Sequence, residues 1–477
     1  MRIRCSLRIV AFAAPAVMAA APYVARGQGF GLNDIGSCAV ARAYATTGAP
    51  CRDASTIYWN PGAAATLPGL SVYLGGDIIG VNGGFTADST LRHTAANVPT
   101  LLVPSVFVNY GMQLGARRAS VGVGVYVPYG LTSQWPTSFP GRFEAQTASL
   151  RTIYYQPNLA IEIIPGVLSI GGGPVIGHSD VVLDQALDLS AVPVPGAPLG
   201  ATFGQFGVPQ GTAFGLAKLR GSATAYGFSA GALLRPGRDF QIGARYLSAL
   251  AFRYDNSIAR FQQLPTGLVL AANNAFGFPA GTPVDALLAP EFSDTGALRR
   301  QGVSTRIVHP LQAEAGIAYT GLPQTTLDVD YAYIGYQSFQ NLPVIFSGPA
   351  ATAGLNRTLL EDYNSSWSLR GSAEHIFGET EHGIAARAGF SYISTPAPQE
   401  TVTPLLPDMN RYNVSGGVGF PLARMLTLDV AYLHVFTAGR RGRLAERADS
   451  SETAAELNSG FYTLAADVFT ASLRLHL

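Results

Sequence analysis

The sequence predicts an all-β protein, an antiparallel transmembrane β-barrel of about 14 strands. Three observations lead to this prediction: an export signal at the N-terminus, a low content of charged residues, and hydrophobic alternation in segments of about 10 residues. Each of them is also found in other classes of protein. A barrel in a bacterial outer membrane fits their combination best.

The N-terminus is typical of a secretory signal peptide. Three arginines within the first eight residues precede an apolar run over residues 9–21. This run is too short for a membrane-spanning helix, and Pro15 interrupts it. A small-x-small cleavage site lies at residues 25–27, and a second one lies at 19–21. We assign residues 1–27 to the signal peptide and expect the chain to be exported.

The composition excludes several classes of protein. Of 477 residues, 48% are hydrophobic and only 13% are charged, whereas an ordinary soluble domain carries about 25% charged residues. A net charge of +1 leaves no basic surface of the kind that binds nucleic acid. Beyond the signal peptide, the sequence has no apolar stretch long enough for a transmembrane helix. A membrane protein of this composition must therefore cross with strands.

Alternation of apolar with small or polar side chains predicts the positions of the strands. Val121, Val123 and Val125 alternate with glycine and tyrosine, and Leu426 and Leu428 alternate with polar residues. A soluble sandwich also alternates, but in an exported chain with few charges the apolar face fits lipid and the polar face fits a barrel lumen. We expect strands over residues 70–79, 101–112, 119–128, 148–163, 166–177, 219–234, 239–254, 307–319, 325–336, 365–377, 383–394, 410–420, 425–437 and 463–477.

Three regions do not show a strand pattern. Residues 28–66 contain Cys38 and Cys51, which can pair in an oxidising periplasm or remain two free small side chains. The long segments 180–218 and 255–306 are too apolar for disordered loops. We expect them to form a docking surface for a hydrophobic molecule, or else a cap in which the two loops pack on each other. The candidates for this surface are Phe203, Phe206, Leu268, Leu270, Phe276 and Phe278.

Several motifs in order along the chain resemble one family. They are the sequence GFGLND at residues 29–34, Asn60-Pro61-Gly62, Pro128-Tyr129-Gly130-Leu131 with the later Gly141-Arg142, and PLLPDMNR at residues 404–411. Together they resemble the FadL-type outer-membrane transporters of long-chain fatty acids and other hydrophobic compounds (OmpP1/FadL/TodX) over residues 28–477. One departure stands out, because Gly62 occupies the place of the alanine in the family's Asn-Pro-Ala motif.

The resemblance implies an architecture and a mechanism. Residues 28–66 would form a hatch inside the lumen of a barrel formed by residues 67–477, with the two long segments as extracellular loops. A hydrophobic ligand would pass the hatch motif and leave sideways into the bilayer through a gap in the third strand. Pro128 is our candidate for that gap, although a proline at a strand end also has a plain structural explanation. Candidate partners for a ligand carboxylate are Arg151, Arg245, Arg253 and Arg370, unless they form structural ion pairs.

These features predict passive uptake of hydrophobic compounds, with long-chain fatty acids favoured, by a monomeric protein in contact with outer-membrane lipid and lipopolysaccharide. The alternatives are an aromatic-hydrocarbon channel, a polar-solute porin, and a lipid hydrolase using Ser229 in the G-x-S-x-G sequence of residues 227–231. That motif lies within an alternating segment instead of at a strand-to-helix turn, so we expect no enzyme. The seven histidines are dispersed, and we expect no cofactor and no metal.

Overall fold

The computed structural model describes residues 29–194, 201–272, 274, 278–352, 354–378, 383–446 and 457–477. The expected signal peptide and Phe276 lie outside the described residues. Among the helices described, none is both long and apolar enough to cross a membrane.

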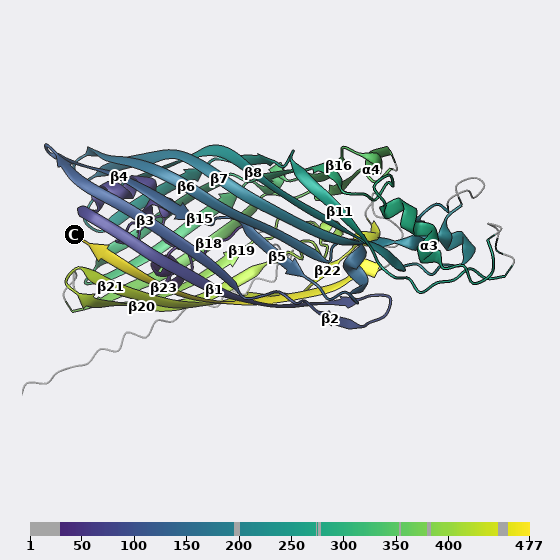
Figure 1. Ribbon diagram of the computed structural model, residues 1–477. Coiled ribbons are helices and arrows are strands. Elements are labelled where there is room, and N and C mark those ends of the chain that lie inside the picture. Colours follow the sequence, from purple (N-terminus) through teal and green to yellow (C-terminus); the bar gives the residue numbers. More distant parts are fainter. Residues whose placement is uncertain are drawn as a thin grey trace, which may run out of the picture.

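The chain forms a closed antiparallel barrel of 14 strands, as predicted (Figure 1). Strand β1 (Gly69–Ala87) pairs on one side with β3 (Leu101–Leu114) and on the other with the last strand, β23 (Gly460–His476), which closes the barrel. The C-terminus lies at one end of the barrel, and the small helices α3 (Val284–Leu288) and α4 (Pro349–Thr352) lie beyond the other end (Figure 1). Since bacterial barrels have short periplasmic turns and long extracellular loops, the end with α3 and α4 faces outward.

Each of the predicted ranges overlaps a strand of the barrel wall. After β1 and β3 these are β4 (Arg117–Tyr126) with β5 (Gly130–Gln134), β6 (Thr147–Ile164), β7 (Leu168–Asp188), β8 (Ala213–Leu234), β9 (Phe240–Leu247) with β10 (Leu250–Arg253) and β11 (Ser257–Gln263), β12 (Gln301–Ser304) with β13 (Arg306–His309) and β14 (Gln312–Leu322), β15 (Thr325–Ile334), β18 (Ser366–Phe377), β19 (Ile384–Ile393), β20 (Arg411–Ala423), β21 (Leu426–Thr437) and β23. Short strands β2 (His93–Ala95), β16 (Asn341–Phe346), β17 (Arg357–Leu360) and β22 (Arg440–Gly442) add to the loop end.

The structure differs from the prediction at the two long segments. The expected loop 255–306 begins with strand β11 and ends with strand β12, which pair with each other. β7 and β8 continue as a paired ladder as far as Asp188 and Ala213, so that part of the expected loop 180–218 is strand. The strand pattern is different here because this part of β7 and β8 extends beyond the lipid into water. Near Leu183, which is buried, the outward-facing neighbours are Asp184 and Arg220. Outside the lipid, the strands still alternate, but their outward-facing side chains are polar. A lipid-facing strand has apolar side chains on that face, so the pattern used to predict strands does not apply here.

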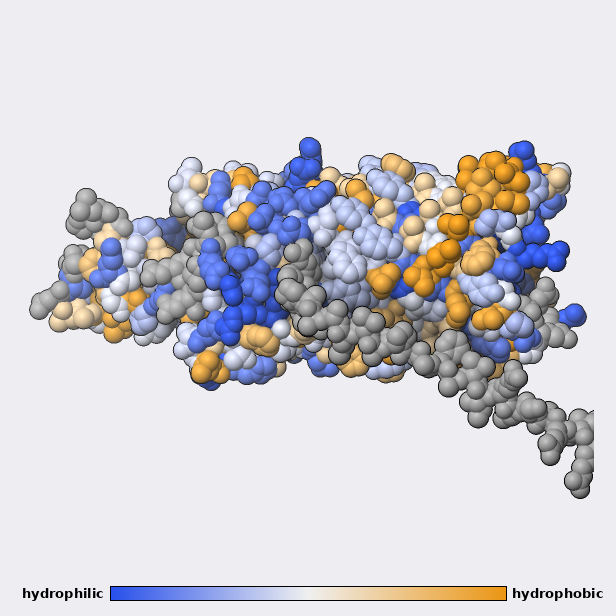
Figure 2. All heavy atoms as spheres, turned by 180° about the vertical axis from the view of Figure 1, so that it is seen from behind, coloured by the Kyte–Doolittle hydropathy of each residue, from blue (hydrophilic) through white to orange (hydrophobic). Residues whose placement is uncertain are grey.

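The outer wall has the pattern that lipid requires. On β6, Tyr155 and Leu159 are exposed, whereas the intervening Gln156 and Asn158 are buried in the lumen. Aromatic rings on the outer face follow one another around the barrel on β15, β18, β19 and β20, with centroid distances of 6.4, 5.2 and 5.1 Å; they are Tyr331, Trp367, Tyr392 and Tyr412. On the face seen in Figure 2, hydrophobic and weakly polar residues form a zone between two hydrophilic ends. Such a belt with aromatic residues at its border marks the bilayer.

The N-terminal segment, residues 29–68, lies inside the barrel. It contains α1 (Ser37–Ala41), α2 (Thr56–Trp59) and the 3-10 helix η1 (Pro61–Thr66), and nearly all of its side chains are buried. These helices are too short to be stable alone. Their stability comes from packing against the inner wall, where η1 contacts β6, β7 and β8 and α1 contacts β20 and β21.

Candidate functional site

Two carboxylates on β15 hold the loop between α1 and α2. The Asp330 carboxylate accepts hydrogen bonds from the backbone N–H groups of residues 46–48, at 2.6, 2.6 and 3.0 Å. The Asp328 carboxylate accepts one from the Ala49 N–H at 2.9 Å and forms a buried ion pair with Arg42 at 3.0 Å. Hydrogen bonds to charged groups are stronger than neutral ones, so this anchor loop, residues 42–49, is fixed to the barrel wall.

A third carboxylate, Glu314 on β14, explains two of the candidate arginines. It pairs with Arg245 at 2.8 Å and with Arg370 at 3.3 Å, and all three side chains are fully buried. The guanidinium of Arg245 lies 3.9 Å from the ring centroid of Tyr58, and that of Arg370 lies 5.7 Å from the ring centroid of Trp59. Arg245 and Arg370 are therefore placed in structural ion pairs beneath the N-terminal segment.

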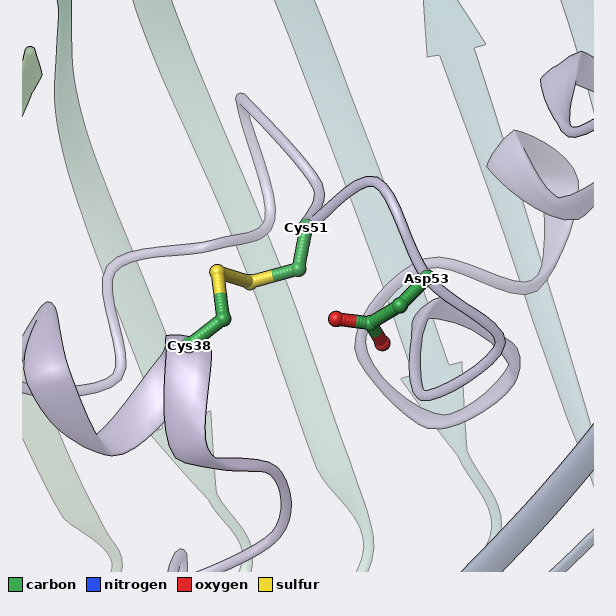
Figure 3. Close-up of side chains that lie close together, drawn as sticks. All are labelled: Cys38, Cys51 and Asp53. Atoms are coloured by element: carbon green, nitrogen blue, oxygen red, sulfur yellow. A yellow bond between two sulfur atoms is a disulfide. The ribbon is translucent and has the colours of Figure 1, made fainter. Parts of the chain in front are cut away.

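The two cysteines of the segment are bonded to each other. The Sγ atoms of Cys38 and Cys51 are 2.05 Å apart, and this bond joins α1 to the chain just after the anchor loop. The Asp53 carboxylate points toward this bridge, and one of its oxygens lies within 4.8 Å of both sulfur atoms (Figure 3). Such a group resembles a metal site in composition, but a bridged sulfur is no longer the thiolate that binds a metal.

The Asn60-Pro61-Gly62 motif packs on glycines of the wall. The Asn60 Nδ2 donates to the Thr47 carbonyl at 3.2 Å and to the Ala232 carbonyl of β8 at 3.0 Å. A Cβ at position 62 would lie 2.6 Å from the Gly231 carbonyl oxygen, and one at position 231 would lie 2.6 Å from the Pro61 ring. This close approach accounts for Gly62 in place of the family's alanine.

The wall has a break in its third strand. β4 ends at Tyr126 and β5 begins at Gly130, and both pair with β6. The N-terminal segment bridges this break, because the Leu32 N–H donates to the Pro128 carbonyl at 2.9 Å and the Gly130 N–H donates to the Phe30 carbonyl at 3.0 Å. On the other side, β3 pairs with β4 only from Val106 onward, which leaves its residues 101–105 without a ladder partner on β4.

A cavity of about 590 Å³ lies at this break. Its inner wall includes Leu32 and Asp34 of the N-terminal segment, and its outer wall includes Leu102 of β3, whose side chain is 73% exposed on the outside of the barrel. A smaller cavity of about 50 Å³ adjoins it and shares Leu131, Leu150 and Leu406. The remaining lining of the smaller cavity is almost entirely apolar, for example Phe30, Leu219, Ile307 and Phe339. Apolar space therefore extends from the lumen to the lipid-facing surface.

One arginine of this cavity was not among the predicted ligand partners. Arg411, at the end of the PLLPDMNR motif, lines the cavity and donates from Nη2 to Asp408 and to the Gly29 carbonyl, both at 3.3 Å. Its Nε–H is buried without a partner among the described residues. Of the predicted candidates, Arg151 borders the cavity from the outer face of β6, and Arg253 is exposed on β10. The motif itself was the sequence signal for Arg411.

The long loops pack mainly on each other. Phe203 is 1% exposed in a second hydrophobic cluster with residues such as Leu189, Phe214 and Leu288, and Leu268 and Leu270 pack against it. Phe206 and Phe278 are 40% and 42% exposed. The loops thus form a cap with its own small core, and only part of the expected apolar surface is open to solvent.

A closed barrel with a lipid-facing belt, a filled lumen and an apolar cavity that reaches the outer wall defines an outer-membrane transporter of hydrophobic compounds. The chain belongs to the family of outer membrane transport proteins described as OMPP1/FadL/TodX, whose sequence model matches residues 17–476. The predicted family and the predicted location in the outer membrane are confirmed.

The relatives agree with this assignment. The long-chain fatty acid transport protein of Shigella flexneri is 24% identical over 429 residues, covering 85% of this chain and 87% of the relative. The crystal structure of a Pseudomonas aeruginosa FadL homologue superposes with a TM-score of 0.73 at 20% identity, covering 94% and 100% of the two chains. The toluene transporter TbuX of Ralstonia pickettii gives 0.59 at 16% identity, covering 92% and 98%. These structures show that the fold is shared.

Family membership also bears on the question of catalysis, because the family transports its ligands. Ser229 of the G-x-S-x-G sequence lies inside β8, where it is paired with Gly173 of β7 and Leu247 of β9. A nucleophile elbow requires a turn between a strand and a helix. Ser229 does not occupy such a turn.

Proposed function

We propose that this protein takes up long-chain fatty acids by passive diffusion through the cavity at the β4–β5 break, with lateral exit into the bilayer. The observation that carries the proposal is Arg411, which places a guanidinium beside an otherwise largely apolar cavity, with an Nε–H that has no partner in the part of the chain that the structure describes. A fatty acid needs this combination of a cation and a long apolar space. The names of the curated relatives, which are long-chain fatty acid transport proteins, support the same substrate.

The charge balance of the cavity suits a carboxylate ligand. Asp34 and Asp408 also line it, but burial raises the pKa of the Asp34 carboxyl, which Tyr44 Oη contacts at 2.6 Å, and burial likewise raises the pKa of Asp408. As the pH falls, these two carboxyl groups therefore become protonated at a higher pH than a carboxyl group in water does. Each protonation removes a negative charge from the neighbourhood of Arg411. We expect ligand binding to strengthen as the pH falls, for as long as the ligand itself stays ionised.

The N-terminal segment would act as the hatch. Residues 29–34 bridge the break in the wall with two backbone hydrogen bonds, and the segment supplies part of the cavity lining. A ligand that separates Phe30 from Pro128 and Gly130 would open the cavity toward Leu102 and the lipid. No energy source is needed, because the ligand moves from one apolar environment to another.

A second candidate substrate is a small aromatic hydrocarbon. The smaller cavity has almost no polar lining, and solved structures with the same fold include toluene transporters. A neutral hydrocarbon would have no use for Arg411. The two substrates are therefore separated by the effect of changing this arginine.

The test is a titration of the purified, folded protein with a fluorescent long-chain fatty acid, followed by competition with oleate and with toluene. We expect saturable binding that oleate displaces, and about a tenfold or greater loss of affinity in Arg411→Gln, since a hydrogen bond to a charged group contributes about 1.5–3 kcal/mol. Arg424→Gln, at an exposed periplasmic turn, is the matched control. Displacement by toluene alone, with full affinity in Arg411→Gln, would favour the hydrocarbon channel. Absence of any saturable binding would contradict both.

A further inference from the structure

Cationic side chains form two facing pairs on the outside of the barrel near its extracellular end. Arg253 of β10 lies directly opposite Arg306 of β13 in the strand register, and Arg260 of β11 lies directly opposite Lys218 of β8. Like charges that face each other across a ladder are destabilising. Two such pairs on neighbouring strands therefore call for an explanation.

The direction of these side chains is fixed by the strand pattern. On β10 and β13 the buried residues are Phe252 and Ile307, so that Arg253 and Arg306 face away from the lumen. On β8 and β11 the buried residues are Leu219 and Ala259, which turns Lys218 and Arg260 outward as well. Arg253, Arg260 and Arg306 are exposed. The four cations thus lie on one outer face, which we name the rim patch.

Nearby carboxylates do not neutralise the rim patch. Asp184 lies opposite Lys218 in the register of β7 and β8, but its carboxylate is paired with Arg220, a further outward-facing cation of β8. Asp180 lies beside His178 on β7. Asp255 follows Arg253 in the turn to β11 and is exposed. Within the part of the chain that the structure describes, no ion pair joins a carboxylate to Arg253, Arg260 or Arg306, and Lys218 donates to the neutral Gln262 at 3.1 Å. The patch keeps a surplus of positive charge.

The height of the rim patch relative to the membrane identifies its partner. Below it on β8 and β9, the exposed rings of Tyr226 and Tyr246 belong to the aromatic border of the lipid belt. The patch lies just beyond this border at the end that carries the long loops, which is the outer surface of the outer membrane. The lipid of that leaflet is a phosphorylated glycolipid.

We propose that the rim patch binds the phosphate groups of lipopolysaccharide in the outer leaflet. Arg253 and Arg306, nearer the aromatic border, meet a phosphate on the lipid-anchored sugars. Lys218 and Arg260, on β8 and β11 and farther from the border, meet phosphates on the core sugars. A guanidinium binds phosphate through two parallel hydrogen bonds, and an anion between two facing arginines removes their mutual repulsion. Bound in this way, the glycolipid would fix the barrel beside the loop cap.

The experiment measures binding of purified lipopolysaccharide to the full-length protein in detergent. We compare the wild type with Arg253→Gln/Arg306→Gln, with Lys218→Gln/Arg260→Gln, and with a control, Arg117→Gln/Arg118→Gln, which removes the same charge from an exposed periplasmic turn. We expect each rim variant to lose about tenfold or more in affinity, because each removes charge-assisted hydrogen bonds. The control should change by less than about twofold, since its charges lie at the opposite end of the barrel.

Two further ligands identify what is recognised. Lipopolysaccharide stripped of its phosphates should bind the wild type as weakly as intact lipopolysaccharide binds the rim variants. Phosphatidylglycerol, which offers a phosphate without the sugars, should bind more weakly than lipopolysaccharide. Retained binding of fluorescent fatty acid would show that the rim variants are folded. Undiminished affinity in folded rim variants, or equal affinity for phosphatidylglycerol, would overturn the proposal.

Discussion

Two parts of the N-terminal segment are held inside the barrel by different means. The anchor loop, residues 42–49, is tied to the wall by the buried carboxylates Asp328, Asp330 and Glu314 and by the Cys38–Cys51 bridge. Residues 29–34 are held at the strand break by two backbone hydrogen bonds and by rings packed around Phe30. Because the two parts have separate supports, the segment does not need to move as a unit. Its first residues can leave the break while the anchor loop stays in place.

The largest expected effect concerns Glu314. Replacing it by glutamine leaves Arg245 and Arg370 buried without a counter-charge, and breaking a buried ion pair typically costs about 3–5 kcal/mol. We expect the free energy of unfolding of the refolded protein, measured with urea, to fall by that amount. The control is Asp184→Asn, whose partner Arg220 is 46% exposed and whose loss should cost less than about 1 kcal/mol. Equal losses in the two variants would show that the buried pair does not hold the anchor loop.

The disulfide is the second support of the anchor loop. Replacing Cys38 and Cys51 by serine removes a bridge between residues 13 apart in the sequence, and for a loop of about 15 residues the chain-entropy estimate is about 3 kcal/mol. Because the ionic anchors still restrict this loop, we expect a loss of about 2–3 kcal/mol with the fold retained. Protease cleavage within residues 42–49 should become faster. Faster cleavage near residue 30 instead would show that the disulfide supports residues 29–34 more than the anchor loop, contrary to this prediction.

The glycine contacts give an effect of intermediate size. In Gly62→Ala the new methyl group would lie 2.6 Å from the Gly231 carbonyl oxygen, and overpacking of this kind costs about 1–3 kcal/mol. The control is Gly371→Ala, where a Cβ would meet nothing within 4 Å. Thermal unfolding of both variants measures the difference. If Gly62→Ala is as stable as the control, the motif does not press on the wall as closely as these distances indicate.

The fold could be predicted from the sequence because every strand in contact with lipid needs an apolar outer face. Alternation with an apolar outer face located the strands of the wall, including β18 and β23. The rule fails where β7 and β8 leave the lipid, since their outer faces become polar there. The alternation therefore predicts a loop for residues 180–188, which are strand in the structure.

The candidate site was harder to predict, because it depends on contacts between distant residues. Glu314 is separated from Arg245 by 69 positions and from Arg370 by 56, and only the strand register brings them together. Arg411 could be recognised within its motif, but its place at the cavity depends on how residues 29–34 lie against the strand break. The sequence alone does not separate an arginine that faces the lumen, such as Arg245, from one that faces outward, such as Arg253.

The smallest expected effect tests the movable part directly. Leu32→Pro removes the N–H that donates to the Pro128 carbonyl, one of the two backbone hydrogen bonds across the break. A hydrogen bond of this kind contributes about 0.5–1.5 kcal/mol, so global stability should change by about that much, while residues 29–34 leave the break more often. We expect faster uptake of fatty acid by cells and faster hydrogen exchange at the Gly130 amide. The amides of residues 46–48, which donate to Asp330, should keep their protection. Equal loss of protection in both places would mean that the segment moves as one body after all.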